Sequence, residues 1–155
     1  MQVDIVDFKT TRVAALEHCG PMEKLNDTID RFINWRRESG LSPQGSNRTF
    51  GIAYDNPETT EPALYRFDIC GEVAADVPVN VQGVIAKTIP GGRCARVRHY
   101  GAHQRLGESI SPLYRDWLPQ SGEKLRDFPL YFHYVNLFPE TRETELVTDI
   151  YLPLK

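Results

Sequence analysis

The sequence contains two degenerate copies of one unit, at residues 11–71 and 92–152. Four residues of the first copy recur 81 positions later in the second: Arg12, Ala14, His18 and Gly20 return as Arg93, Ala95, His99 and Gly101. Two copies are too few for a solenoid, which needs about three or more repeats to bury a continuous core. The repeat therefore predicts one domain with pseudo-twofold symmetry, unless the matches reflect chance and shared strand composition.

The chain length and composition agree with a single domain over residues 1–155. A chain of 155 residues with 41% hydrophobic composition is long enough to bury a core of its own. We place copy one at about residues 2–75 and copy two at about 80–155. A strand over 3–8 is expected to start the first copy and a strand over 81–89 the second, with Gly91 and Gly92 forming a hairpin turn between strands.

Charge and cysteine content exclude several classes of function. The net charge of −3, with both signs mixed along the chain, lacks the basic stripe of a nucleic-acid surface, so we expect no direct nucleic-acid binding. The three cysteines have no metal-ligand spacing, and no apolar stretch suits a signal peptide or a membrane span. These features favour a reduced cytoplasmic protein without a metal, a cofactor or a membrane partner.

A helix in each copy follows the first Gly-terminated strand. Apolar residues recur at helical spacing after Gly20 and Pro21, and Gly40 is a suitable stop. The expected apolar stripe of this helix consists of Met22, Leu25, Ile29, Phe32 and Ile33. In the second copy, Pro112 removes a backbone donor from the matching helix, so we expect a kink or a break there.

Each copy is predicted to run strand, helix, strand, strand. The duplicated β-α-β-β units give an α+β fold, with helices on one face of a largely antiparallel sheet and a central cleft on the other face. Alternation along the last strands predicts that the helices cover Tyr65, Phe67 and Ile69, together with Leu146, Thr148, Ile150 and Leu152.

The opposite face carries the candidate ligand-binding residues. Strand alternation places Asp68 and Asp149 there, together with Cys70 and Tyr151. The neighbouring strands are expected to add Ile52, Tyr54, Phe132 and Tyr134. An aromatic cleft with an acid on each side suits flat, hydrophobic, cationic ligands. The alternative is that both carboxylates are bonded to Ser, Thr or Arg neighbours and serve only the fold.

Catalytic arrangements are weaker in the sequence. Cys19 and His18 are adjacent, and neighbouring strand residues face opposite ways, so they are not expected to act as a nucleophile and base. No phosphate-binding glycine loop is present. We therefore expect no catalytic residues and a protein that is not an enzyme.

Three ordered motifs resemble a known family over nearly the whole chain. They are the residues at 51–57 followed by 65–68, those at 116–122, and those at 148–154, which read GIAYDNP with YRFD, DWLPQSG and TDIYLPL. These motifs resemble the GyrI-like small-molecule-binding family, which includes gyrase-inhibitory proteins and the effector-binding domains of AraC/XylS-type regulators. The resemblance implies a duplicated fold that binds a small, hydrophobic, often cationic effector in a cleft between its halves.

The resemblance also implies how this chain differs from its relatives. AraC/XylS-type regulators carry a DNA-binding module before this domain, whereas here the domain starts at about Met1. Family members usually have a Glu two residues before the counterpart of Tyr134, and Phe132 stands there, so either Asp149 or Asp68 compensates or the ligand is neutral. The second hypothesis is that the chain binds a protein partner, such as a separate regulator or DNA gyrase. The third is that it is a hydrolase of reactive natural products. The chain itself is expected to be a monomer or a homodimer.

Overall fold

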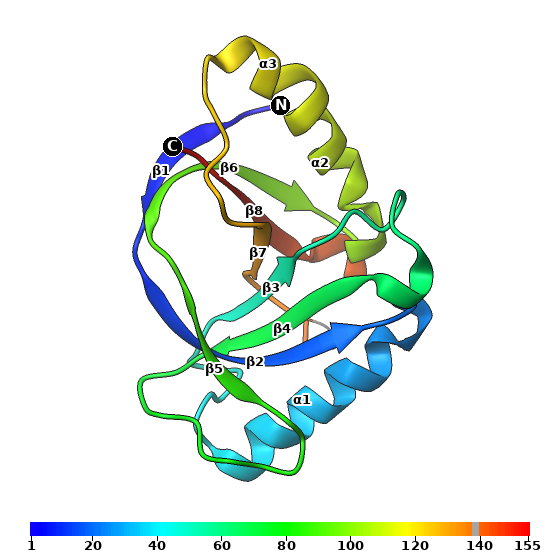
Figure 1. Cartoon of the computed structure of the whole chain (residues 1–155), viewed down its shortest axis with the longest axis vertical. Helices are drawn as coiled ribbons and strands as arrows, with labels where there is room; N and C mark the ends of the chain where they lie inside the picture. Colours follow the sequence, from blue (N-terminus) through cyan, green and yellow to red (C-terminus); the bar gives the residue numbers. More distant parts are fainter. Residues whose placement is uncertain (138–139) are drawn as a thin grey trace. The chain divides into compact units, whose positions relative to one another are not determined.

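A computed structural model describes residues 1–137 and 140–155, and these divide into two compact units. The first unit joins Met1–Lys9 to Gly91–Lys155, and the second comprises Thr10–Pro90. Each unit contains a four-stranded antiparallel sheet with helical segments, which makes the fold α+β (Figure 1). In the second unit the strand order is β3 (Thr49–Ala53), β4 (Arg66–Glu72), β2 (Thr11–Cys19) and β5 (Ile85–Ile89). In the first unit it is β1 (Asp4–Phe8), β6 (Gly92–Tyr100), β8 (Val147–Pro153) and β7 (Leu130–Tyr134).

Every strand of the first copy has a counterpart of the same length 81 positions later. The pairs are β1 with β5, β2 with β6, β3 with β7, and β4 with β8. The short 3₁₀ turns Met22–Lys24 and Pro62–Leu64 likewise recur at His103–Arg105 and Glu143–Glu145. The repeat in the sequence is therefore also a repeat of secondary structure, with the expected order of strand, helix, strand, strand in each copy.

The compact units differ from the sequence copies by an exchange of their first strands. Strand β1 pairs with β6 of the second copy, and β5 pairs with β2 of the first (Figure 1). The two pairings have reciprocal registers, since Asp4 lies opposite Arg96 and Ile85 lies opposite Ala15. The boundaries at about 2–75 and 80–155 describe the sequence repeat, whereas the packing joins each copy to the other copy's first strand.

The expected hairpin at Gly91 and Gly92 is wrong, because β5 and β6 lie in different units. Gly92 has a φ of 142°, but β5 pairs with β2, whereas β6 pairs with β1 and β8, so Gly91 and Gly92 do not close a hairpin. The connectors after β1 and after β5 instead carry the chain from one unit to the other.

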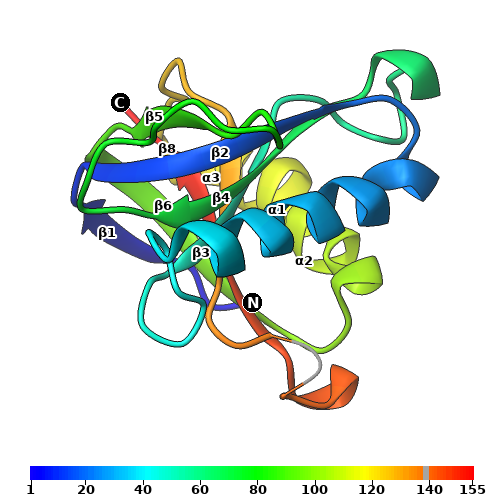
Figure 2. The ribbon, with the colours of Figure 1, turned by 90° about the horizontal axis from the view of Figure 1, so that it is seen from below.

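The first helix ends where the sequence predicts and begins later. Helix α1 (Leu25–Ser39) stops at Gly40, whose φ of 67° is the left-handed conformation that glycine adopts without strain. The preceding residues Met22–Lys24 form a 3₁₀ turn, which leaves Met22 half exposed. Figure 2 shows α1 lying along the sheet of its unit, where its buried residues are Thr28, Phe32, Trp35 and Arg36.

The second helix is broken at the predicted position. Helix α2 (Gly107–Pro112) ends at Pro112, a π-helical segment follows over Leu113–Trp117, and α3 (Leu118–Ser121) completes the run. Proline in a helix interior leaves a carbonyl without its usual donor, and local π geometry is a common response. Among the residues the structure describes, no helix is both long and apolar enough to cross a bilayer.

A buried arginine organises the end of β4 in the second unit. Arg36 is 5% exposed, and its guanidinium donates to Ser42 O at 2.6 Å, Thr49 Oγ1 at 2.7 Å and Asn47 O at 3.2 Å. All of these acceptors are neutral, and burial lowers the pKa of Arg36 to about 10. Gly71 leaves the space that this arrangement needs, because a Cβ there would meet Ser42 Oγ and lie 3.1 Å from Arg36 Nη2.

Replacing Gly71 with Ala is therefore expected to destabilise the protein by about 1–3 kcal/mol, the usual cost of overpacking a filled core. Urea denaturation would measure the loss. Gly45→Ala is the matched control, because a Cβ at Gly45 has no atom within 4 Å, and its effect should stay within about 0.5 kcal/mol. Equal unfolding free energies for the two variants would contradict this account of Gly71.

Candidate functional site

The second unit brings together three of the predicted ligand-binding residues. In the sheet register, Ile52 on β3 and Glu17 on β2 both lie opposite Asp68 on β4, so the three share one face. Tyr54 lies just beyond β3, and its hydroxyl donates a hydrogen bond of 2.6 Å to Asp68 Oδ2. The structure therefore brings Ile52, Tyr54 and Asp68 together on one face, while their role in ligand binding stays a prediction.

Asp68 is already neutralised by a lysine that the sequence analysis did not anticipate. Lys87 Nζ on β5 lies 2.7 Å from Asp68 Oδ2 and 2.9 Å from Glu17 Oε2. The same ammonium lies 5.5 Å from the centre of the Tyr54 ring, within cation–π range. Asp68 is only 2% exposed, so its carboxylate is enclosed by these partners. Lys87 could not be found from the sequence because β5 joins this sheet only through the strand exchange.

This network shifts the acidity of its members. Burial, followed by the hydrogen bond to Asp68, raises the pKa of Tyr54 to about 12, although the nearby Lys87 opposes the shift. Burial alone would lower the pKa of Lys87, but its hydrogen bonds to Asp68 and Glu17 raise it above its ordinary value. At neutral pH the tyrosine is therefore protonated and the lysine charged.

Asp149 in the first unit is neutralised in a different way. Arg98 on β6 donates two hydrogen bonds to its carboxylate, at 2.8 and 3.0 Å. The 81-residue repeat makes Arg98 the counterpart of Glu17, and Val6 the counterpart of Lys87. Asp68 and Asp149 occupy equivalent positions of the repeat, and each is paired with one cation. The two cations lie on strands that are not equivalent, since Lys87 is on β5 and Arg98 is on β6. Asp149 is thus bonded to an arginine, as the alternative expected, whereas the partners that the structure describes for Asp68 are Lys87 and Tyr54 and not Ser, Thr or Arg.

Tyr151 shares the face of Asp149 and belongs to a packed aromatic cluster. The rings of Tyr131 and Tyr151 stack with centres 5.1 Å apart, and Phe8 on β1 meets both edge-on at 5.1 Å. The Tyr131 hydroxyl lies 3.4 Å from Cys94 Sγ, within hydrogen-bonding distance for sulfur. Since Tyr131 is fully buried and Tyr151 is 8% exposed, this cluster is part of the core of its unit.

The prediction that Phe132 and Tyr134 share the face of Asp149 is wrong. Strand pairing sets Phe132 opposite Ile150 and Tyr134 opposite Thr148, whereas His133 lies opposite Asp149. Treating Tyr134 as the equivalent of Tyr54 implies an offset of 80 residues, one less than the 81 that relates β3 to β7. Because side chains alternate with a period of two, a slip of one residue moves the whole set to the other face.

Phe132 and Tyr134 instead lie on the helix side of their sheet. His99, which pairs with Thr148 on this face, is 2.8 Å from Ser109 Oγ in α2. The first copy has an equivalent contact, in which His18 Nδ1 lies 2.9 Å from Thr28 Oγ1 in α1. These two histidines connect each helix to the strand that precedes it.

The His103 ring lies beside Tyr134 on this helix side. Their centres are 5.0 Å apart, and the Phe132 ring centre is 6.2 Å from that of Tyr134. Burial lowers the pKa of His103, with a smaller effect from His99, so the ring is neutral at pH 7. Thr148 is fully buried beneath the same face. The sequence pattern does not point to His103, because its neighbour Tyr134 is 31 positions away in the chain.

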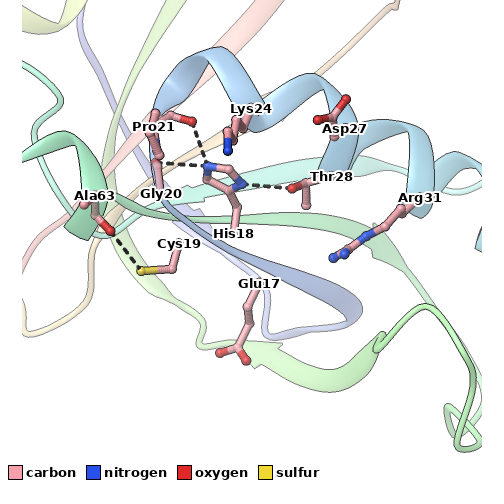
Figure 3. Close-up of a pocket in the computed structure, with 10 residues that line it drawn as sticks. All are labelled: Glu17, His18, Cys19, Gly20, Pro21, Lys24, Asp27, Thr28, Arg31 and Ala63. Atoms are coloured by element: carbon pink, nitrogen blue, oxygen red, sulfur yellow. Dashed lines mark hydrogen bonds between the residues drawn. The ribbon is translucent and has the colours of Figure 1, made fainter.

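A separate polar hollow of about 450 Å³ lies beside the start of α1 in the second unit (Figure 3). Its wall includes Lys24, Asp27 and Arg31 from the helix and its preceding turn. His18 is held by Thr28 and by the Gly20 carbonyl at 3.1 Å, while the Cys19 thiol points to the Ala63 carbonyl at 3.8 Å. Cys19 and His18 therefore have separate partners. No group of three metal-ligating side chains occurs within residues 1–137 and 140–155.

The whole chain, residues 1–155, matches the family described as the GyrI-like small molecule binding domain, and the chain belongs to this family. It is similar to the "Probable transcriptional regulator YgiV" of Escherichia coli K12, with 46% identity over 155 residues that cover 99% of this chain and 96% of that protein. A DNA gyrase inhibitor of Erwinia billingiae is 23% identical over 160 residues, covering 99% and 97% of the two chains.

Solved structures share the fold at low sequence identity. The C-terminal domain of EcmrR superposes with a TM-score of 0.81 at 18% identity, over 99% of this chain and 97% of that one. A hydrolase encoded by lin2189 of Listeria innocua gives 0.67 at 8% identity, over 99% and 92%. SAV2435, solved with bound tetraphenylphosphonium, gives 0.62 at 10% identity, over 100% and 94%. These likenesses support the predicted α+β fold.

The Tyr54 network makes a prediction about tyrosine titration. Asp68→Asn should lower the pKa of Tyr54, because it replaces a charged acceptor, which stabilises the protonated phenol, with a neutral one. Lys87→Met should raise the same pKa, because the ammonium favours the phenolate. Absorbance of the phenolate against pH would measure both, with Tyr54→Phe identifying the transition. Shifts of the same sign in the two variants would contradict the network.

Proposed function

We propose that this chain is a binding module for a small hydrophobic effector or drug and not an enzyme. The observation that carries the proposal is the match of the whole chain to a small-molecule-binding family. The name of YgiV, a transcriptional regulator 46% identical to this chain, supports a role in which ligand binding is coupled to transcription. Cytoplasmic location follows from that role.

We propose Phe132 and Tyr134 as the principal ligand contacts among the seven predicted residues. Asp68 and Asp149 are ion-paired, Tyr54 is bonded to Asp68, and Ile52 and Tyr151 are buried, whereas Tyr134 is partly exposed beside the buried Phe132. Phe132 and Tyr134 form, with His103, an aromatic group on the helix side of the first unit. Stacked aromatic side chains are typical walls of pockets for hydrophobic ligands.

The ligand is proposed to be neutral. Both candidate carboxylates are already paired with Lys87 or Arg98, and a bound cation would have to displace one of these partners. A hydrophobic residue also stands at Phe132, where relatives are expected to carry an acid. The bound tetraphenylphosphonium of SAV2435 makes lipophilic cations the appropriate comparison.

A protein-interaction role is the second candidate, because a relative matching nearly the whole chain is named as a DNA gyrase inhibitor. A gyrase supercoiling assay with added protein would detect it. Hydrolysis, suggested by the name of the lin2189 product, would need an acidic or water-positioning group held beside the reacting bond. Both predicted aspartates are engaged in ion pairs, and Phe132 stands where relatives are expected to carry an acid, so we do not propose this activity.

Binding to the aromatic group predicts a specific effect of Tyr134→Ala. Benzophenone and tetraphenylphosphonium, a neutral and a cationic aryl probe, would be titrated by thermal shift and intrinsic fluorescence. We expect the neutral probe to bind more tightly and Tyr134→Ala to weaken it about tenfold, a loss of about 1.4 kcal/mol. Tyr100→Ala is the control, since Tyr100 is 70% exposed and lies outside the group. Equal affinities in wild type and Tyr134→Ala would exclude this site.

A further inference from the structure

Two buried polar atoms on the helix side of the first unit lack hydrogen-bond partners. They are Thr148 Oγ1 and His103 Nε2, and neither is bonded within residues 1–137 and 140–155. Leaving a buried donor or acceptor unpaired costs about 1–3 kcal/mol, and folded proteins contain few such groups. Two of them near one another therefore require an explanation.

Both atoms belong to residues that surround Tyr134. Thr148 on β8 lies between His99 on β6 and Tyr134 on β7 in the sheet register. His103 contacts the Tyr134 ring from the 3₁₀ turn before α2. His99 cannot satisfy either atom, because its two nitrogens are engaged by Ser109 Oγ at 2.8 Å and the Ala102 carbonyl at 3.1 Å.

The first copy shows that the fold does not require polar groups here. At the positions 81 residues earlier, Met22, Ala53 and Phe67 stand in place of His103, Tyr134 and Thr148. The histidine that contacts the helix is present in both copies, since His18 matches His99 and makes the equivalent contact to α1. The duplication thus keeps the structural contact in both copies and places a polar trio in the second copy alone.

We propose that Thr148 Oγ1 and His103 Nε2 form the polar end of a ligand site whose apolar wall is Tyr134 and Phe132. The hydroxyl of Thr148 both donates and accepts, and the neutral imidazole does one or the other according to its tautomer. Such a pair suits a neutral hydroxyl or carbonyl group on an aromatic or aliphatic frame. Glu143 is an acidic group whose charge reaches His103, and because it is exposed it does not offer a cation a buried carboxylate. This inference deepens the proposed function and rests on it.

Three probes of similar shape would test the assignment. Benzhydrol carries a hydroxyl, benzophenone a carbonyl, and diphenylmethane neither group. A site built to hydrogen-bond its ligand discriminates strongly against an analogue that lacks the polar group. We expect wild type to bind benzhydrol and benzophenone at least about tenfold more tightly than diphenylmethane.

Thr148→Val provides the decisive variant, because valine has nearly the shape of threonine without the hydroxyl. It should reduce the affinity for benzhydrol about tenfold, a change of about 1.4 kcal/mol, and leave that for diphenylmethane unchanged. The unfolding midpoint without ligand should be unchanged or higher, since an unpaired hydroxyl is removed. His103→Phe should weaken benzhydrol in the same way while retaining an aromatic ring beside Tyr134. Thr59→Val, at an exposed position, is the control.

The outcomes separate this inference from the proposed function. Equal affinities for all three probes, unaffected by Thr148→Val but reduced by Tyr134→Ala, would overturn the polar site and leave the binding module intact. A Thr148→Val variant that loses stability would also overturn it, because an internal water then satisfies the hydroxyl. Failure of wild type to bind any of the probes would overturn both.

Discussion

The pairing of each copy's long second strand with the other copy's first strand is the constraint on which both sheets depend. Strand β1 lies 84 to 92 positions from its partners on β6, and β5 lies 70 to 78 positions from its partners on β2. Neither copy contains all the strands of one sheet. Closing such long loops costs entropy before the contacts form, so both sheets depend on nonlocal pairing.

The exchanged strands also supply the residues that complete the chemistry of each unit. Lys87 on β5 neutralises Asp68, and Phe8 on β1 closes the cluster of Tyr131 and Tyr151. The two copies pair their equivalent buried aspartates, Asp68 and Asp149, with different cations. Asp149 takes its cation from Arg98 on the adjacent strand, whereas Glu17 at the matching position makes Lys87 necessary in the first copy. The strand positions thus repeat at an offset of 81 residues, while the charged side chains differ between the copies.

Local features of the fold were accessible from the sequence because local physics decides them. Gly40 ends α1 through a left-handed residue, and Pro112 interrupts the second helix by removing a donor. Strand alternation correctly separated Asp68 from Phe67 and Asp149 from Ile150. The same rule failed for Phe132 and Tyr134, because an alignment one residue out of register reverses every facing assignment.

The sequence by itself determined the repeat, the α+β class, the C-terminal end of α1, the break at Pro112 and the family. Those features depend on periodicity, backbone preferences and motifs within short stretches of chain. Only the tertiary structure decided which strand joins which sheet, and hence that Lys87 faces Asp68 and that His103 and Thr148 flank Tyr134. The physical reason is that strand exchange and sheet register bring together residues that are far apart in the chain, and no local pattern specifies those partners.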